Sequence, residues 1–175
     1  MKQIYTIGHS TRSLEELVRL LRHEAITRLA DIRRFPGSKR HPHFAREALA
    51  RSLPEAEIEY VHFEELGGRR KAAADSPHTA LRNEQFRAYA DHMATPEFRA
   101  AVDRLLDSEK RTAYMCAEAV PWRCHRNMLS DELVRRGLTV VHILGEGQRQ
   151  KHALHADARV EGDRIVYAPA ERKLF

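Results

Sequence analysis

Cysteine, tryptophan and long apolar runs are all scarce in this chain. Its 175 residues include two cysteines and one tryptophan. Two cysteines are too few for a disulfide framework, so we interpret both as thiols that are buried, reactive or metal-bound. Charged residues or histidines interrupt every apolar run within a few positions, which excludes a transmembrane helix. Because the first residues already follow a strand pattern, we expect no signal peptide, no membrane contact and a cytoplasmic location.

Familiar ligand-binding motifs are missing as well. The chain contains neither a Walker P-loop nor a GxGxxG fingerprint. The stretch from Cys116 to Arg123 has six intervening residues and no glycine, so the phosphatase-type cysteine loop does not fit. Seven residues lie between Cys116 and Cys124, and His125 follows the second cysteine, a spacing that lacks the CxxC pairs of structural zinc sites.

The bulk composition describes one globular unit with a mild positive charge. A hydrophobic content of 42% over 175 residues predicts a single domain, with a core over residues 1–144 and an extension over 145–175. The 30 Lys and Arg residues exceed the 25 Asp and Glu residues by five. This excess is modest for a protein that coats nucleic acid but suits attraction of an anionic ligand.

Strand-like and helix-like segments alternate along the chain. Ser13 and Glu16 form a capping box for the first helix, and Thr95-Pro96 separates two helical stretches between residues 81 and 108. Strands are expected at residues 3–7, 27–32, 59–63, 111–115 and 138–143, of which the first and the last are expected to be buried. This alternation predicts a three-layer α/β/α fold with a mainly parallel sheet of about five strands. A small C-terminal β-hairpin is expected to turn at Gly162.

Polar residues follow several of these strands. In a parallel sheet the carboxyl ends of the strands lie along one edge, so groups distant in sequence meet there. This edge is expected to gather His9 and Ser10, Asp31 and Arg33, Arg69, and Cys116 with Glu118.

The stretch from Cys116 to Arg126 is the centre of this expected site. Cys124, His125 and Arg126 are predicted to open a helix, whose first turn favours an anion and lowers a cysteine pKa. Cys124 is therefore the better thiolate candidate, and Arg126 is a candidate for holding a phosphate. An inert buried thiol is the alternative for Cys116, and zinc chelation by Cys116, Cys124 and His125 is the alternative for the group.

Other candidates also have a structural alternative. Glu118 and Asp31 are a candidate acid–base pair, although Asp31 is equally suited to bonding Arg33. His9 is a candidate ligand or proton donor, or it bonds the loop backbone. Trp122 is placed to stack on a base or sugar, or to close a hydrophobic gap.

Two basic loops, residues 33–46 and 69–71, are expected to flank the same edge. The first contains no acidic residue, and the second reads Arg-Arg-Lys. Together they predict either a basic rim that steers a nucleotide or nucleic-acid backbone, or a solvated surface.

Four blocks of the sequence resemble the signature of a known family, called domain of unknown function 488. They are TIGHST at 6–11, DIR at 31–33 with Pro36, YVHF at 60–63 running into LGGR at 66–69, and CAE at 116–118 through CHR at 124–126. The resemblance extends to Ile143 and implies a bacterial or archaeal cytosolic α/β domain without an established reaction. It also implies that the polar residues of these blocks form one site, namely His9, Ser10, Asp31, Arg33, Glu118, Cys124, His125 and Arg126.

These observations favour an enzyme that acts on a phosphate-bearing ligand such as a nucleotide or nucleic-acid component. In this hypothesis Arg33 and Arg126 hold the anion, Glu118 or Asp31 handles protons, and Cys124 with His125 forms a nucleophile and base. A non-catalytic nucleic-acid-binding module and a thiol redox or metal protein are the alternatives. The sequence specifies no cofactor, substrate or oligomeric state.

Overall fold

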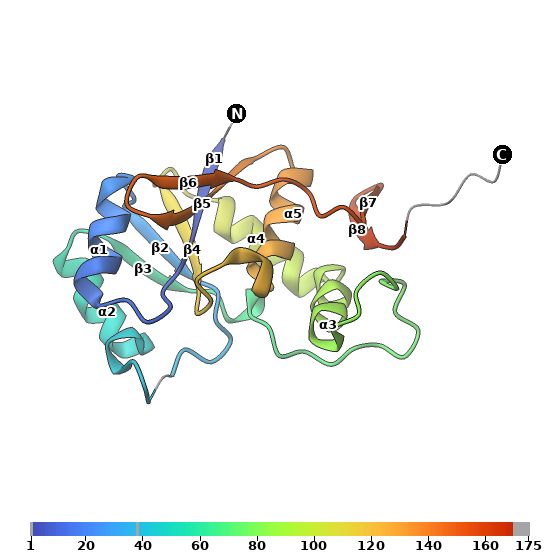
Figure 1. The fold of residues 1–175 in the computed structure, drawn as a ribbon, viewed down its shortest axis with the longest axis horizontal. Helices are drawn as coiled ribbons and strands as arrows, with labels where there is room; N and C mark the ends of the chain where they lie inside the picture. The colour runs from blue at the N-terminus through green and yellow to red at the C-terminus, as the bar shows by residue number, and fades with distance from the viewer. Residues whose placement is uncertain (1, 38, 170–175) are drawn as a thin grey trace.

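The computed structural model describes residues 2–37 and 39–169 and contains a six-stranded sheet between two layers of helices (Figure 1). The strand order is β3-β2-β4-β1-β5-β6, in which β1 to β5 are parallel and β6 is antiparallel to β5. The strands are β1 (Gln3–Gly8), β2 (Arg28–Asp31), β3 (Glu59–His62), β4 (Thr112–Cys116), β5 (Thr139–Gly145) and β6 (Gln148–Lys151). The α/β class and the mainly parallel sheet expected from the sequence are confirmed.

The sheet has one strand more than the sequence led us to expect. The additional strand, β6, consists of four exposed polar residues, Gln148–Lys151. It lies at the edge of the sheet and turns no apolar side chain inward, so it has no hydrophobic alternation that a sequence pattern could detect. The expected C-terminal hairpin is present as β7 (Ala158–Glu161) and β8 (Arg164–Tyr167).

In the described part of the chain five α-helices connect the strands, and two of them begin at caps expected from the sequence. They are α1 (Leu14–His23), α2 (Arg46–Glu55), α3 (Glu84–Met93), α4 (Pro96–Leu106) and α5 (Arg126–Arg135). The Ser13 hydroxyl accepts a hydrogen bond from the Glu16 backbone N–H at 3.1 Å, and Thr95 caps α4 ahead of Pro96. None of the helices in the described part of the chain combines the length and the apolar character needed to cross a bilayer.

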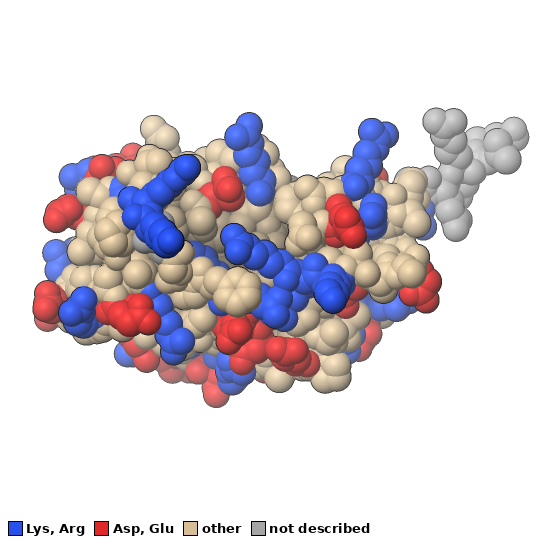
Figure 2. Space-filling view, turned by 90° about the horizontal axis from the view of Figure 1, so that it is seen from below, with Lys and Arg blue, Asp and Glu red and all other residues tan. Residues whose placement is uncertain are grey.

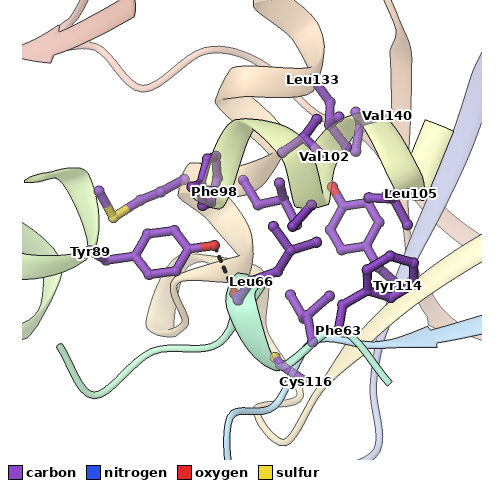
Figure 3. Packing of buried hydrophobic residues seen from close by; sticks show 14 of the residues in the cluster. Phe63, Leu66, Tyr89, Phe98, Val102, Leu105, Tyr114, Cys116, Leu133 and Val140 are labelled. Carbon is purple, nitrogen blue, oxygen red and sulfur yellow. Dashed lines mark hydrogen bonds between the residues drawn. The ribbon is translucent and has the colours of Figure 1, made fainter. Parts of the chain in front are cut away.

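Alternating residues of the central strands face two separate hydrophobic cores. In β1, Ile4 joins the core beneath α3, α4 and α5, whereas Tyr5 and Ile7 join the core beneath α1 and α2. In Figure 3 Cys116 lies at the edge of the first of these clusters, close to Phe63. Cys116 thus occupies the boundary between a packed core and the carboxyl edge of the sheet.

The carboxyl ends of β1 and β4 are neighbours, and the connections that leave them cross the sheet in opposite directions. Gly8 at the end of β1 pairs with Cys116 at the end of β4. The chain leaves β1 for α1 on one face of the sheet and leaves β4 for α5 on the other face. Ligands of open α/β sheets bind in the crevice that such a divergence creates.

Candidate functional site

A pocket of about 300 Å³ opens at the carboxyl edge of the sheet, beside the ends of β2 and β4. Four arginines line it, together with both cysteines, His125 and Glu118; Glu118 is the only carboxylate among the described residues of its wall. The arginines are Arg33, Arg34, Arg69 and Arg123. Among the described residues, the guanidinium groups of Arg69 and Arg123 have no hydrogen-bonding partner. The pocket is therefore electropositive and retains donors for a ligand.

Two glycines allow the loops around this pocket to approach one another closely. A Cβ on Gly8 would lie 1.7 Å from the Glu118 carbonyl oxygen, and a Cβ on Gly67 would lie 2.4 Å from the Arg34 backbone nitrogen. The His9 N–H donates to the Cys116 carbonyl at 3.0 Å, which fixes the loop after β1 against the loop after β4. Glycine is required at both positions because any side chain would push these loops apart.

The two cysteines lie side by side and differ in acidity. Burial opposes ionisation of Cys116, but the neighbouring Cys124 thiol and the Arg126 guanidinium outweigh it and lower the Cys116 pKa to about 7. The same neighbour and burial raise the pKa of Cys124 well above its ordinary value. The helix-start argument favoured Cys124 as the thiolate, whereas the surroundings of this coupled pair favour ionisation of Cys116 over Cys124.

His125 precedes α5 and is uncharged at neutral pH. Burial lowers its pKa to about 4, and the Arg126 and Arg70 charges act in the same direction against a backbone hydrogen bond at Ile32. Its Nδ1 lies 3.5 Å from the Cys124 sulfur. A neutral imidazole in this position can accept the Cys124 proton, but it cannot contribute a positive charge to the pocket.

Arg126 begins α5 as expected, but its side chain lies inside the protein. It is fully buried and donates to the Thr6 hydroxyl at 2.8 Å and to the Glu118 carbonyl at 2.9 Å. Arg126 does not line the pocket, so we reassign the ligand contact expected of it to the arginines of the wall. Its buried charge instead orients the loop after β4 and lies close enough to Cys116 to lower its pKa.

Asp31 and Arg33 form a buried ion pair at the end of β2. The Asp31 carboxylate accepts from Arg33 Nε at 2.9 Å and Nη2 at 2.7 Å, and from the Tyr60 hydroxyl at 2.5 Å. Burial opposes the charge of Arg33, but Asp31 raises its pKa above the ordinary value. Because the Asp31 carboxylate is occupied by these donors, it positions Arg33, which is the structural role considered for it from the sequence.

The remaining candidates lie beside or beneath the pocket. His9 is buried, with Nδ1 2.9 Å from the Ser10 carbonyl and its ring 4.4 Å from that of Phe44; burial chiefly lowers its pKa to about 4. Ser10 and Trp122 line a second, adjoining hollow that shares Glu118 and Arg123 with the pocket. The Trp122 side chain is 58% exposed and closes no hydrophobic gap.

Comparison with protein families matches residues 13–133 to the domain of unknown function DUF488. The chain belongs to this family. The matched region covers most of the chain, including the blocks around Asp31, Gly67 and Cys116, and begins after the loop that carries His9. A search of curated proteins found no match. A search of solved structures likewise found none.

Membership of the family supplies no reaction, so the chemistry has to be inferred from the site. Within the described residues, His, Cys, Asp and Glu side chains nowhere gather in a group of three or more that could hold a metal ion. The zinc alternative for Cys116, Cys124 and His125 therefore has no support from the geometry.

Three residues of the pocket wall carry no signal in the sequence analysis. Phe35 follows two arginines in the first basic loop, and Gln85 and Phe86 belong to the first turn of α3. The place of Phe35 in a basic loop, between Arg34 and Pro36, is the one sequence feature that could have indicated it. Nothing local distinguishes Gln85 and Phe86, because the fold brings α3 to this edge over a long loop.

A buried polar chain runs from Arg126 away from the pocket. Thr6 Oγ1 lies 2.7 Å from His142 Nδ1, His142 Nε2 lies 2.9 Å from His152 Nδ1, and His152 Nε2 lies 2.7 Å from Asp131. A carboxylate only accepts, so His152 donates to Asp131 through Nε2. Burial, with the nearby His152 and Arg126, lowers the His142 pKa to about 3, so His142 is uncharged at neutral pH.

Proposed function

We propose that the pocket binds a phosphate-bearing small ligand of the nucleotide class and holds it against the thiolate of Cys116. The observation that carries this proposal is that unpaired arginine donors and a thiol with a pKa of about 7 line one cavity. Guanidinium groups recognise phosphate oxygens through paired hydrogen bonds. A volume of about 300 Å³ suits a small ligand.

The residues divide into binding, reacting and positioning roles. Arg34, Arg69 and Arg123 contact the anion, and Cys116 is the nucleophile because it lines the same cavity and its neighbours lower its pKa. Cys124 donates a hydrogen bond to that thiolate. Glu118 lies in the wall of the pocket, where it can accept or return a proton.

Ligand binding can be tested by thermal denaturation with inorganic phosphate, nucleoside monophosphates and sugar phosphates. We expect at least one nucleotide to raise the melting temperature in a concentration-dependent way. Arg69→Ala and Arg123→Ala should each weaken that ligand roughly tenfold, since each removes a hydrogen bond to a charged group.

Arg19→Ala is the matched control, because Arg19 lies on α1 and pairs only with the exposed Glu146. It removes the same charge without touching the pocket. If no compound shifts the melting temperature, or if Arg19→Ala weakens binding as much as the pocket variants, the proposal is wrong.

A further inference from the structure

Two aromatic side chains stand exposed at the same edge as the pocket. Four large apolar side chains are exposed among the described residues: Phe35 at 59%, Trp122 at 58%, Val160 at 52% and Leu154 at 39%. Both aromatic members of this set border the site. Phe35 lines the pocket, and Trp122 lines the adjoining hollow. Their rings leave apolar surface in water without contributing to either core, so folding does not explain them.

Arginines alternate with these rings. The Arg34 and Arg69 guanidinium carbons lie 5.2 and 5.9 Å from the centre of the Phe35 ring, and Arg123 follows Trp122 directly and lines both hollows. Figure 2, which looks onto the underside of Figure 1, shows Lys and Arg side chains in a band across the molecule with acidic side chains on either side. Aromatic faces interleaved with cations are typical of surfaces that stack bases and track a phosphate backbone.

The backbone at this edge carries conformations that helix capping does not explain. Among residues 2–37 and 39–169, four non-glycine residues have positive φ: Ser10, Ala25, Glu57 and Arg69. Ala25 and Glu57 directly follow the ends of α1 and α2, where the left-handed conformation closes a helix. Neither Ser10 nor Arg69 follows the end of an α-helix; Arg69 lines the pocket and Ser10 lines the adjoining hollow. Backbone strain of this kind collects at ligand-binding loops.

The position of Trp122 determines how far a ligand must extend. Trp122 does not line the pocket, so a mononucleotide seated there contacts Phe35 but leaves Trp122 untouched. A ligand that contacts both rings has to continue past Arg123 into the second hollow. The bases of a duplex are already stacked on one another, whereas those of a single strand are available to separate side chains.

We propose that the substrate class is single-stranded nucleic acid, with one base on Phe35, another on Trp122 and the phosphates on Arg34, Arg69 and Arg123. This inference rests on the proposed function, because it extends the same anion-binding pocket. The inference keeps part of the hypothesis that the two basic loops bind nucleic acid. Arg34 and Arg69 face the ligand, whereas Arg70 donates its hydrogen bonds to the Gly67 and Glu64 carbonyls.

The single tryptophan makes a direct titration possible, since all indole fluorescence comes from Trp122. Eight-nucleotide oligo(dT) and oligo(U) should quench it, while a nucleoside monophosphate and a duplex of the same length should not. Comparison of oligo(dT) with oligo(U) shows whether DNA or RNA binds more tightly. Three phosphate contacts predict that log Kd rises with log salt concentration with a slope of about 2.

Two variants separate stacking from simple charge attraction. Trp122→Ala and Phe35→Ala should each weaken oligonucleotide binding roughly 5- to 150-fold, the range for loss of one stacked base, measured by anisotropy of a labelled strand. Trp122→Phe should retain most of the affinity. Val160→Ala on the C-terminal hairpin is the control for loss of an exposed apolar side chain and should change nothing.

The outcomes distinguish this inference from the proposed function. If Trp122→Ala leaves oligonucleotide affinity unchanged while monophosphates still stabilise the wild type, the single-strand inference is overturned and the proposed function stands. Equal binding of duplex and single strand also overturns it. If neither monophosphates nor oligonucleotides bind, both proposals fail together.

Discussion

Two polar regions of this protein contain the same kinds of side chain and use them in opposite ways. In the chain beneath α5, Asp131 is fully buried and accepts from His152 at 2.7 Å, the Tyr167 hydroxyl at 2.7 Å and the His155 N–H at 3.1 Å. In the pocket, the Arg69 and Arg123 guanidinium groups line an open cavity without a partner among the described residues. Saturated polar groups stabilise a fold, whereas groups with spare donors are available to a ligand.

Arg126 connects the two regions. One Nη group donates to Thr6 at the head of the buried chain, and the other donates to the Glu118 carbonyl behind the pocket. The buried polar chain from Thr6 to Asp131 therefore holds in place the Arg126 guanidinium, which together with Cys124 lowers the Cys116 pKa. Substitutions in the buried polar chain are therefore expected to lower the stability of the protein. Substitutions in the pocket are expected to weaken ligand binding or raise the Cys116 pKa.

The largest loss of stability is expected from removing the Asp131 carboxylate of the buried polar chain. Asp131→Ala leaves the His152 and Tyr167 donors buried without an acceptor, which should lower the free energy of unfolding by about 3–5 kcal/mol. Urea denaturation followed by circular dichroism measures the loss. A loss below 1 kcal/mol would show that the chain is not a stabilising unit.

The next effect is expected at Gly8, where the two regions meet. Gly8→Ala places a methyl group 1.7 Å from the Glu118 carbonyl, which has to move, so overpacking should cost about 1–3 kcal/mol or more. Because Glu118 and Cys116 belong to the same loop, the pKa of Cys116 should rise as well. Gly37→Ala is a suitable control, since a Cβ there meets nothing within 4 Å. Equal stability of the two variants would contradict the close packing of the loops.

A change confined to the pocket should alter acidity more than stability. Cys124→Ala removes the hydrogen bond to the Cys116 thiolate and should raise the Cys116 pKa by about 1–2 units, as one charge-assisted hydrogen bond predicts. Cys124→Ser keeps a donor and should retain most of the lowered pKa. The pH dependence of iodoacetamide labelling of Cys116 gives the value. An unchanged pKa in Cys124→Ala would refute the assignment.

A smaller, distributed effect is expected from the buried histidines. His9, His125 and His142 have pKa values of about 4, 4 and 3, below the ordinary value of 6.5, so each is neutral in the folded protein. The unfolded chain binds protons first as the pH falls. The contribution of these neutral histidines to the free energy of unfolding is therefore complete above pH 6.5 and is lost as the pH falls from 6.5 through 4. The urea midpoint should decline over this interval, and His142→Asn should flatten the decline.

Features that depend on local patterns could be predicted from the sequence. The helix cap at Ser13, the boundary at Thr95-Pro96 and the five parallel strands all depend on neighbouring residues, and the structure contains them. The common edge of Asp31 and Cys116 followed from the parallel topology alone. The polar edge strand β6 was missed because it lacks a hydrophobic alternation.

The direction in which a side chain points could not be predicted. Arg126 stands beside Cys124 and His125 in sequence, but its partner Thr6 lies 120 positions away, so its burial is a property of the whole sheet. The same holds for His152 and Tyr167, which bond Asp131, and for His142, which bonds His152, because these contacts form only after β5 and the C-terminal hairpin are in place. The acidity of Cys116 over Cys124 depends on this arrangement, and the helix-start argument alone favoured the other thiol.

Labelling of Cys116 by iodoacetamide as a function of pH, with and without a bound nucleotide, tests the central claim most directly. Tryptic mass spectrometry reads Cys116 separately from Cys124. Our account predicts a midpoint near pH 7 and clear protection by saturating nucleotide, because the thiolate and the anion share one pocket. A midpoint near 9 and equal labelling with and without nucleotide would contradict it.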